Sequence, residues 1–101
     1  MARLIFTEDL FDNLSRVIQF LVDEQPGPAL ETADIVLDAI EILAHHPLIG
    51  RPLQSGQREL VIARGRSGYV ARYLYVEPID VVYVLSLHHQ RESPDGDDER
   101  K

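Results

Sequence analysis

Residues 58–92 read RELVIARGRSGYVARYLYVEPIDVVYVLSLHHQRE, and this stretch decides the fold. It contains three short segments that are rich in Val, Ile, Leu and Tyr and are separated by Gly, Pro and Asp. This is the composition of β-strands and their turns. The segments are Glu59–Ala63, Tyr69–Val76 and Val81–Leu87. Because both connections are short, the stretch predicts an antiparallel meander of three strands.

The residues before this stretch predict one more strand and two helices. Arg3–Phe6 is a short apolar run, and Thr7 with the two acids after it has the pattern of a helix N-terminus. Apolar residues then recur at helical spacing in two segments. We expect the first helix to end near Gln25 and the second to begin at Pro28. The order β-α-α-β-β-β predicts an α+β fold, with a helical hairpin packed on one face of an antiparallel sheet.

Length and composition predict a single domain. The chain has 101 residues and is 45% hydrophobic, which is enough for one core. We expect this domain to cover residues 1–92 and the acidic tail 93–101 to be disordered, because the tail has no aliphatic or aromatic residue. The chain lacks cysteine, which excludes disulfides and thiolate metal sites. Without a secretory signal or a membrane-spanning apolar run, we expect a cytoplasmic protein with no membrane partner.

Charge is distributed unevenly along the chain, whose net charge is −7. Residues 7–48 contain nine acids and one arginine, whereas residues 51–72 contain five arginines and one acid, Glu59. The overall acidity argues against broad nucleic-acid binding. Arginine makes bidentate contacts, so a local arginine surface suits an acidic protein partner or a phosphate.

Three arginines of the sheet region are the first candidates for a binding site. Arg64 and Arg66 flank Gly65 in a hairpin loop, where we expect them to be exposed. Arg72 lies within a strand, on a face that is otherwise aliphatic, so its guanidinium must reach an acid or the edge of the sheet. Two interpretations remain open: exposed loop charges with one structural ion pair, or a surface that binds a partner.

The end of the last strand supplies the other candidates, His88, His89 and Arg91. Adjacent histidines in a strand lie on opposite faces, so the pair does not form a two-ligand metal site. Either histidine is of a residue type that can act as a general acid or base near neutral pH, although capping and hydrogen bonding at the sheet edge are the alternative roles. Arg91 is the stronger functional candidate. We expect no metal and no cofactor.

Four segments in this order resemble the RelE/ParE superfamily of bacterial toxins from type II toxin–antitoxin modules, also called plasmid stabilisation proteins. The segments are HPLIGRP (46–52), RELV (58–61), SGYVARY (67–73) and VLSLHHQR (84–91), and the similarity runs from about Ala2 to Glu92. The resemblance implies a small toxin that is neutralised, in a hetero-oligomer, by an antitoxin encoded beside it. It further implies one of two targets. The RelE branch cleaves mRNA in the ribosomal A site, and the ParE branch inhibits DNA gyrase.

The catalytic set of the RelE branch matches this chain poorly. Such nucleases use basic residues on the second and third strands, a late arginine and a tyrosine after it. The lysine positions correspond here to Val61 and Ala63, the arginine after Tyr69 is replaced by Val70, and no tyrosine follows the late Arg91. Cations that hold the scissile phosphate would therefore be missing.

We therefore expect a ParE-like toxin that binds its target protein. The residues expected to contact a partner are Arg64, Arg66, Arg72 and Arg91. The alternative is a ribosome-dependent endoribonuclease, whose catalytic candidates would be Arg72, Arg91, His88 and His89. A decayed, non-toxic homologue that only binds an antitoxin is the third interpretation.

Overall fold

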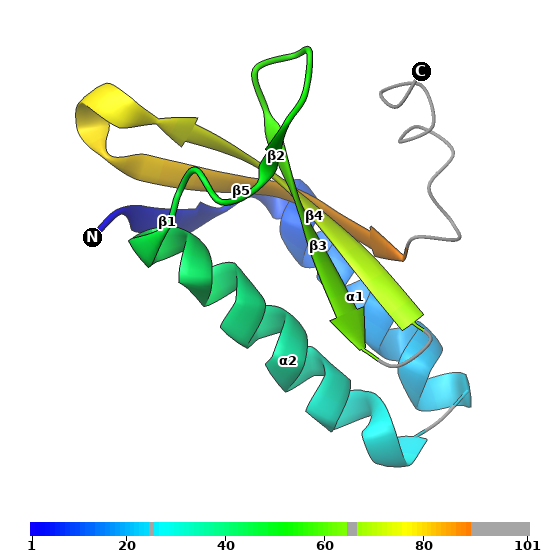
Figure 1. Cartoon of the computed structure of the whole chain (residues 1–101). Coiled ribbons are helices and arrows are strands. Elements are labelled where there is room, and N and C mark those ends of the chain that lie inside the picture. The colour runs from blue at the N-terminus through cyan, green and yellow to red at the C-terminus, as the bar shows by residue number, and fades with distance from the viewer. Residues whose placement is uncertain (25, 65–66, 90–101) are drawn as a thin grey trace.

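The computed structural model describes residues 1–24, 26–64 and 67–89. Within this part of the chain, a strand and two helices are followed by four strands (Figure 1). The elements are β1 (Arg3–Phe6), α1 (Glu8–Glu24), α2 (Pro26–His45), β2 (Arg51–Pro52), β3 (Arg58–Arg64), β4 (Ser67–Val76), a 3₁₀ turn (Glu77–Ile79) and β5 (Val81–His89).

The described strands form one sheet in the order β1-β5-β4-β3-β2. The pairs β2–β3, β3–β4 and β4–β5 are antiparallel, as the meander predicted. β1 pairs with β5 in parallel, so the sheet is mixed and not wholly antiparallel. A parallel neighbour requires a long connection, and the helical hairpin provides one by carrying the chain from β1 to the opposite edge of the sheet.

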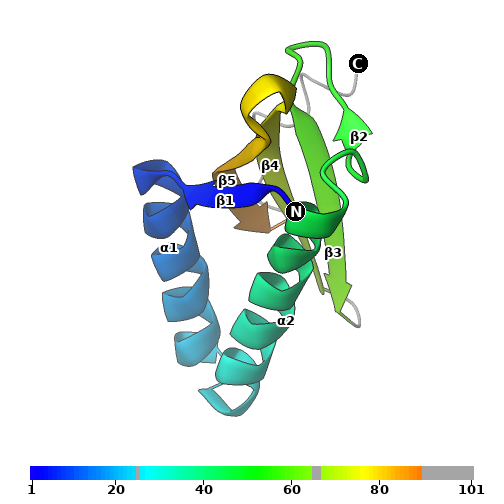
Figure 2. The ribbon, with the colours of Figure 1, turned by 90° about the vertical axis from the view of Figure 1, so that its left-hand side faces the viewer.

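Both helices cover one face of the sheet, which confirms the α+β prediction (Figure 2). Burial of apolar side chains between these two layers supplies the main stabilising free energy. The buried core contains Leu10 and Val17 from α1, Val36, Ile40 and Leu43 from α2, and Ile62, Tyr69, Ala71, Tyr73, Val82, Val84 and Leu87 from the sheet.

Thr7 caps α1, as its sequence context predicted. Its Oγ1 accepts a hydrogen bond from the backbone N–H of Leu10 at 3.2 Å and donates to the carbonyl oxygen of Val84 at 3.0 Å. The cap therefore satisfies a free helix donor and fixes α1 to β5 at the same time. α2 begins at Pro26, two residues earlier than expected, because proline is compatible with the first turn of a helix.

The strands extend beyond their predicted limits. β3 continues to Arg64 and β4 begins at Ser67, so only residues 65–66, which lie outside the described residues, separate the two strands. β5 continues to His89. The segment Leu48–Gln57, expected to be a loop, contains the two-residue strand β2.

A β-bulge at Leu85 shifts by one residue the alternation of β5 side chains between the two faces of the sheet. Arg72 pairs with Ser86, but the next residue of β4, Tyr73, pairs with Val84. Val82 and Val84 are two residues apart, as in a regular strand, whereas Val84 and Leu87 are three apart. Because Leu85 is the extra residue, all three side chains still point into the core. Bulges increase the local twist, which contributes to the strongly curled sheet.

The predicted disordered tail, 93–101, lies outside the described residues, so its expected disorder stays a prediction, as does the single domain over 1–92. Neither helix, over its described residues, is long and apolar enough to cross a membrane.

Candidate functional site

Arg72 lies on the face of the sheet that is turned away from the helices. Its neighbours along β4, Ala71 and Tyr73, are fully buried in the core between sheet and helices. Because side chains alternate along a strand, Arg72 projects from the opposite face. Arg72 nevertheless has only 16% of its side chain exposed.

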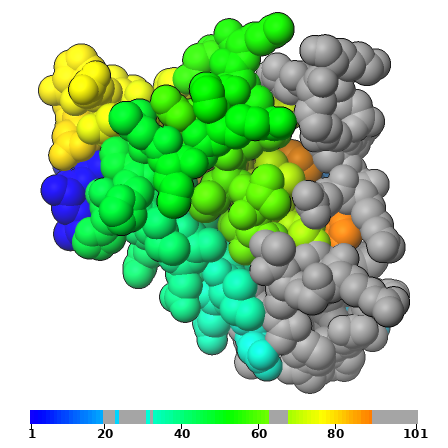
Figure 3. Space-filling view, in the orientation of Figure 1, coloured from blue at the N-terminus to red at the C-terminus, as the bar shows by residue number. Residues whose placement is uncertain are grey.

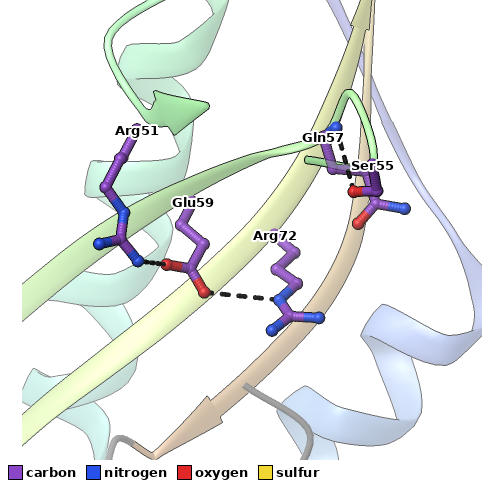
Figure 4. A network of polar contacts seen from close by, with 5 residues as sticks. All are labelled: Arg51, Ser55, Gln57, Glu59 and Arg72. Atoms are coloured by element: carbon purple, nitrogen blue, oxygen red, sulfur yellow. Dashed lines mark hydrogen bonds and ion pairs between the residues drawn. The ribbon is translucent and has the colours of Figure 1, made fainter. Parts of the chain in front are cut away.

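A buried carboxylate, Glu59, lies between two arginines on this face (Figure 4). Glu59 is directly opposite Arg72 in the β3–β4 pairing, and its Oε2 is 3.5 Å from Nε of Arg72. Its Oε1 accepts a hydrogen bond of 2.6 Å from Nη2 of Arg51, on β2. Glu59 is 4% exposed and is the only charged residue among the fully buried residues of the described chain. One acid therefore connects three adjacent strands.

The two ion pairs differ in their environment. The Arg51 side chain is 58% exposed, so water competes for it and the pair contributes little to stability. Arg72 is mostly desolvated, and its Nε and Nη2 atoms, like Oε2 of Glu59, are buried without a hydrogen-bond partner in the described structure. Removing Glu59 would thus leave a buried guanidinium without a counter-charge, which is costly.

A second set of polar contacts fixes the loop between α2 and β2. The backbone N–H of Gly50 donates to Oη of the buried Tyr73 at 2.8 Å. Nη1 of Arg58 donates to the carbonyl oxygens of Gly50, at 2.8 Å, and Leu48, at 3.2 Å. Burial raises the pKa of Tyr73, and the Gly50 N–H and the Arg58 charge oppose that rise. Further along, the N–H of Gln57 donates to Oγ of Ser55 at 3.4 Å before β3 begins (Figure 4).

Of the four predicted arginines, the structure describes the side chain of Arg72 alone. Arg72 has an acid partner, which is one of the two solutions that its position in an aliphatic strand face allowed. Arg64 is the last residue of β3 and pairs with Ser67, but its side chain is not among those described. Arg66 and Arg91 lie outside the described residues, so the grouping of the four arginines stays a prediction.

The histidines of β5 lie on opposite faces, as expected. His89 pairs with Tyr69, and the two rings meet edge to face with centroids 5.3 Å apart. His88 pairs with Val70 and shares the face of Arg72. The described residues contain no cluster of three or more His, Cys, Asp or Glu side chains suited to a metal ion.

Three polar residues of this region were not among the predicted site residues: Arg51, Arg58 and Glu59. The signal for Glu59 was present in the sequence, because it is the one acid in the basic segment 51–72. Its pairing with Arg72 depends on the register of the β3–β4 hairpin. A five-residue loop was expected there, and the strands in fact approach to within two residues of each other.

Comparison with known proteins agrees with the fold. The family model described as the ParE toxin of the type II toxin–antitoxin system parDE matches residues 4–94. Toxin RelE3 of Caulobacter vibrioides is 32% identical over 80 residues, which cover 79% of this chain and 85% of that protein.

Two solved structures have the same architecture. A chain of the chromosomal ParDE toxin–antitoxin system from P. aeruginosa superposes with a TM-score of 0.72 at 19% identity, and the match covers 88% of this chain and 96% of that one. A chain of the RelBE2 toxin–antitoxin complex from Mycobacterium tuberculosis gives a TM-score of 0.58 at 22% identity, covering 88% and 98%. The chain belongs to the ParE toxin family of type II toxin–antitoxin systems, within the RelE/ParE superfamily.

Proposed function

We propose that this toxin arrests growth in the cytoplasm by binding a target protein, DNA gyrase, and that it breaks no bond itself. The observation that carries the proposal is the composition of the open sheet face. A ribonuclease needs several cations there to hold the scissile phosphate. Here Val61, which is 57% exposed, occupies one such position, and the nearby Arg72 is already paired with Glu59.

We further propose that a cognate antitoxin neutralises the toxin by covering its arginines with an acidic segment. The candidates are Arg64, Arg66 and Arg91, with Arg72 as a weaker one because it is mostly buried and already paired with Glu59. Charge-assisted bonds between these guanidinium groups and carboxylates would give tight and oriented binding. The related solved chains come from toxin–antitoxin systems, which supports a hetero-oligomer of this kind.

A supercoiling assay with purified toxin and purified gyrase tests the proposed target. We expect micromolar toxin to inhibit supercoiling, and we expect added antitoxin to restore it. Full supercoiling activity at micromolar toxin, with toxin that still arrests growth when expressed, would contradict the gyrase proposal.

A ribosome-dependent endoribonuclease is the second candidate function, because one histidine lies on the right face for it. His88 projects from the face that carries Arg72, and its strand neighbour on that face, Ser86, pairs directly with Arg72. Histidine is the side chain that most often serves as a general acid or base, which a 2′-hydroxyl nucleophile requires. Sequencing of mRNA ends after induction tests this function, and codon-boundary cleavage that disappears in Arg91→Ala would favour it over gyrase binding.

Expression without growth arrest, with antitoxin binding intact, would instead indicate a decayed toxin.

A further inference from the structure

The loop between α2 and β2 exposes two adjacent aliphatic side chains. Leu48 is 62% exposed and Ile49 is 55% exposed. A single exposed aliphatic residue is ordinary on a protein surface, but two together on a projecting loop favour a contact with another molecule.

Several hydrogen bonds hold this loop against the sheet, and one of them, from Gly50 to Tyr73, is buried. The carbonyl oxygens of Leu48 and Gly50 both accept hydrogen bonds from Arg58, and the N–H of Gly50 donates to the buried Tyr73 hydroxyl. The N–H of Ile49 also donates to the carbonyl oxygen of His46 at 3.1 Å. Because the loop is ordered before binding, a partner would not have to meet the entropic cost of ordering it.

A groove of about 480 Å³ opens beside the two aliphatic side chains. Its walls come from the α2–β2 loop and from the end of β4 with the 3₁₀ turn that follows it, which lie next to each other in the space-filling view as green and yellow surfaces (Figure 3). The lining residues are His46, Pro47, Leu48, Ile49, Tyr75 and Glu77. Most of this lining is apolar, and Glu77 supplies a negative charge.

The β4 side of the groove is electrostatically negative. The Tyr75 hydroxyl donates a hydrogen bond of 2.7 Å to Oδ1 of Asp80. That bond, together with the charges of Asp80 and Glu77, raises the pKa of Tyr75 above its ordinary value. A cation brought to this rim would therefore be attracted to two carboxylates.

The groove lies at the opposite end of β4 from Arg64, and Arg72, three residues before Tyr75, projects from the opposite face of the sheet. β4 runs from Ser67, beside Arg64, to Val76, beside the groove. Tyr75 lies eight residues after Ser67 along an extended strand, which corresponds to roughly 25 Å. A partner segment in the groove and an acidic segment on Arg64 would therefore occupy opposite ends of β4.

We propose that this groove is a second protein-binding surface, and that its occupant is a partner segment with an aliphatic or aromatic side chain next to a lysine or arginine. The apolar side chain packs between Leu48, Ile49 and Tyr75, and the cation meets Glu77. The chemistry of the groove alone defines this occupant, whatever the target of the toxin.

Selection from a random peptide library displayed on phage tests this proposal with the full-length toxin as bait. We expect the enriched peptides to carry an apolar residue adjacent to Lys or Arg. Their affinity should fall at least about tenfold for Leu48→Ser/Ile49→Ser, since buried apolar anchors dominate such contacts. Glu77→Lys should weaken the same peptides and select acidic residues in place of basic ones. Phe11→Ser, on α1 at 53% exposure, is the matched control and should leave binding unchanged.

Several results would overturn the proposal. These are a selection that enriches no peptide, peptides that bind Leu48→Ser/Ile49→Ser as tightly as the unmodified toxin, or a preference for acidic peptides. Sedimentation that shows a toxin dimer, lost in Leu48→Ser/Ile49→Ser, would assign the groove to a second copy of the chain instead. Thermal melting of each variant confirms that it is folded. Failure of the supercoiling assay would leave the peptide result unaffected, so the two proposals can fail separately.

Discussion

Nε of Arg72 lies 3.5 Å from Oε2 of Glu59, and the two residues face each other directly across the β3–β4 pair. The same carboxylate holds Arg51 on β2 through its other oxygen. Glu59 is thereby the counter-charge for a mostly buried arginine and the link among three strands. This relationship explains how an arginine is accommodated on an otherwise aliphatic strand face.

Substitution of Glu59 should strongly destabilise the fold. In Glu59→Gln the Arg72 guanidinium loses its counter-charge while it stays mostly buried, and breaking a buried ion pair in this way costs about 3 kcal/mol or more. Arg51→Ala is the matched control. Because Arg51 is largely hydrated, we expect that variant to lose no more than about 1 kcal/mol. Denaturant unfolding measures both values.

The double variant Glu59→Leu/Arg72→Met separates charge from packing. Replacing both partners of a buried pair by apolar residues is often neutral, so this variant should be more stable than Glu59→Gln. Equal unfolding free energies for Glu59→Gln and the unmodified chain would show that the carboxylate does not compensate Arg72.

Gly50 should not tolerate a side chain. A Cβ atom at this position would lie 2.6 Å from Oη and 2.7 Å from Cε1 of Tyr73, and 2.8 Å from the carbonyl oxygen of Glu59. Gly50→Ala therefore requires the loop to move away from the sheet, and we expect a loss of about 1–3 kcal/mol, as for other overpacked sites. Thermal or denaturant unfolding measures this loss. Ser55→Ala, at an exposed position in the next loop, between β2 and β3, should be close to neutral, and an equally neutral Gly50→Ala would contradict the close contact.

Alkaline pH should destabilise the fold through Tyr73. Burial raises the pKa of its hydroxyl above the ordinary value of 10.0, so above that pH the unfolded chain releases this proton more readily than the folded chain does. The contribution of Tyr73 to the free energy of unfolding is therefore fully present below pH 10.0. It is lost as the pH rises through the pKa that Tyr73 has in the folded state. Unfolding free energies measured from about pH 8 to pH 11 should fall at the alkaline end. This decrease in unfolding free energy should be smaller in Tyr73→Phe. An equal decrease in Tyr73→Phe would show that other groups cause the alkaline destabilisation.

The sequence predicted the layers of the fold well because each layer has a clear periodicity. The two helical stripes place Leu10, Val17, Val36 and Ile40 in the core, and the structure buries all four. The Thr7 cap was equally readable, because threonine before two acids is a local signal. The parallel pairing of β1 with β5 was not predicted, since nothing in a four-residue apolar strand identifies its distant neighbour.

The candidate site was less predictable because it depends on register. Shortening the β3–β4 connection from five residues to two adds Arg64, Ser67 and Gly68 to the strands and establishes the pairing of Glu59 with Arg72. The strand pattern predicted that Arg72 reaches either an acid or the edge of the sheet, but it did not decide between them or identify Glu59. The bulge at Leu85 likewise changes which residues of β5 face the core, and no local pattern marked it.

The central proposal is that Arg64 and Arg66, which are also candidate antitoxin contacts, contact the target protein, and that the toxin cleaves nothing. Its most direct test is the concentration dependence of gyrase inhibition by the unmodified toxin, by Arg64→Glu/Arg66→Glu and by the control Arg3→Glu, which alters an exposed arginine of β1. The claim predicts that the unmodified toxin and Arg3→Glu inhibit supercoiling equally, and that Arg64→Glu/Arg66→Glu does not inhibit while it melts at the same temperature. Equal inhibition by all three proteins would contradict it.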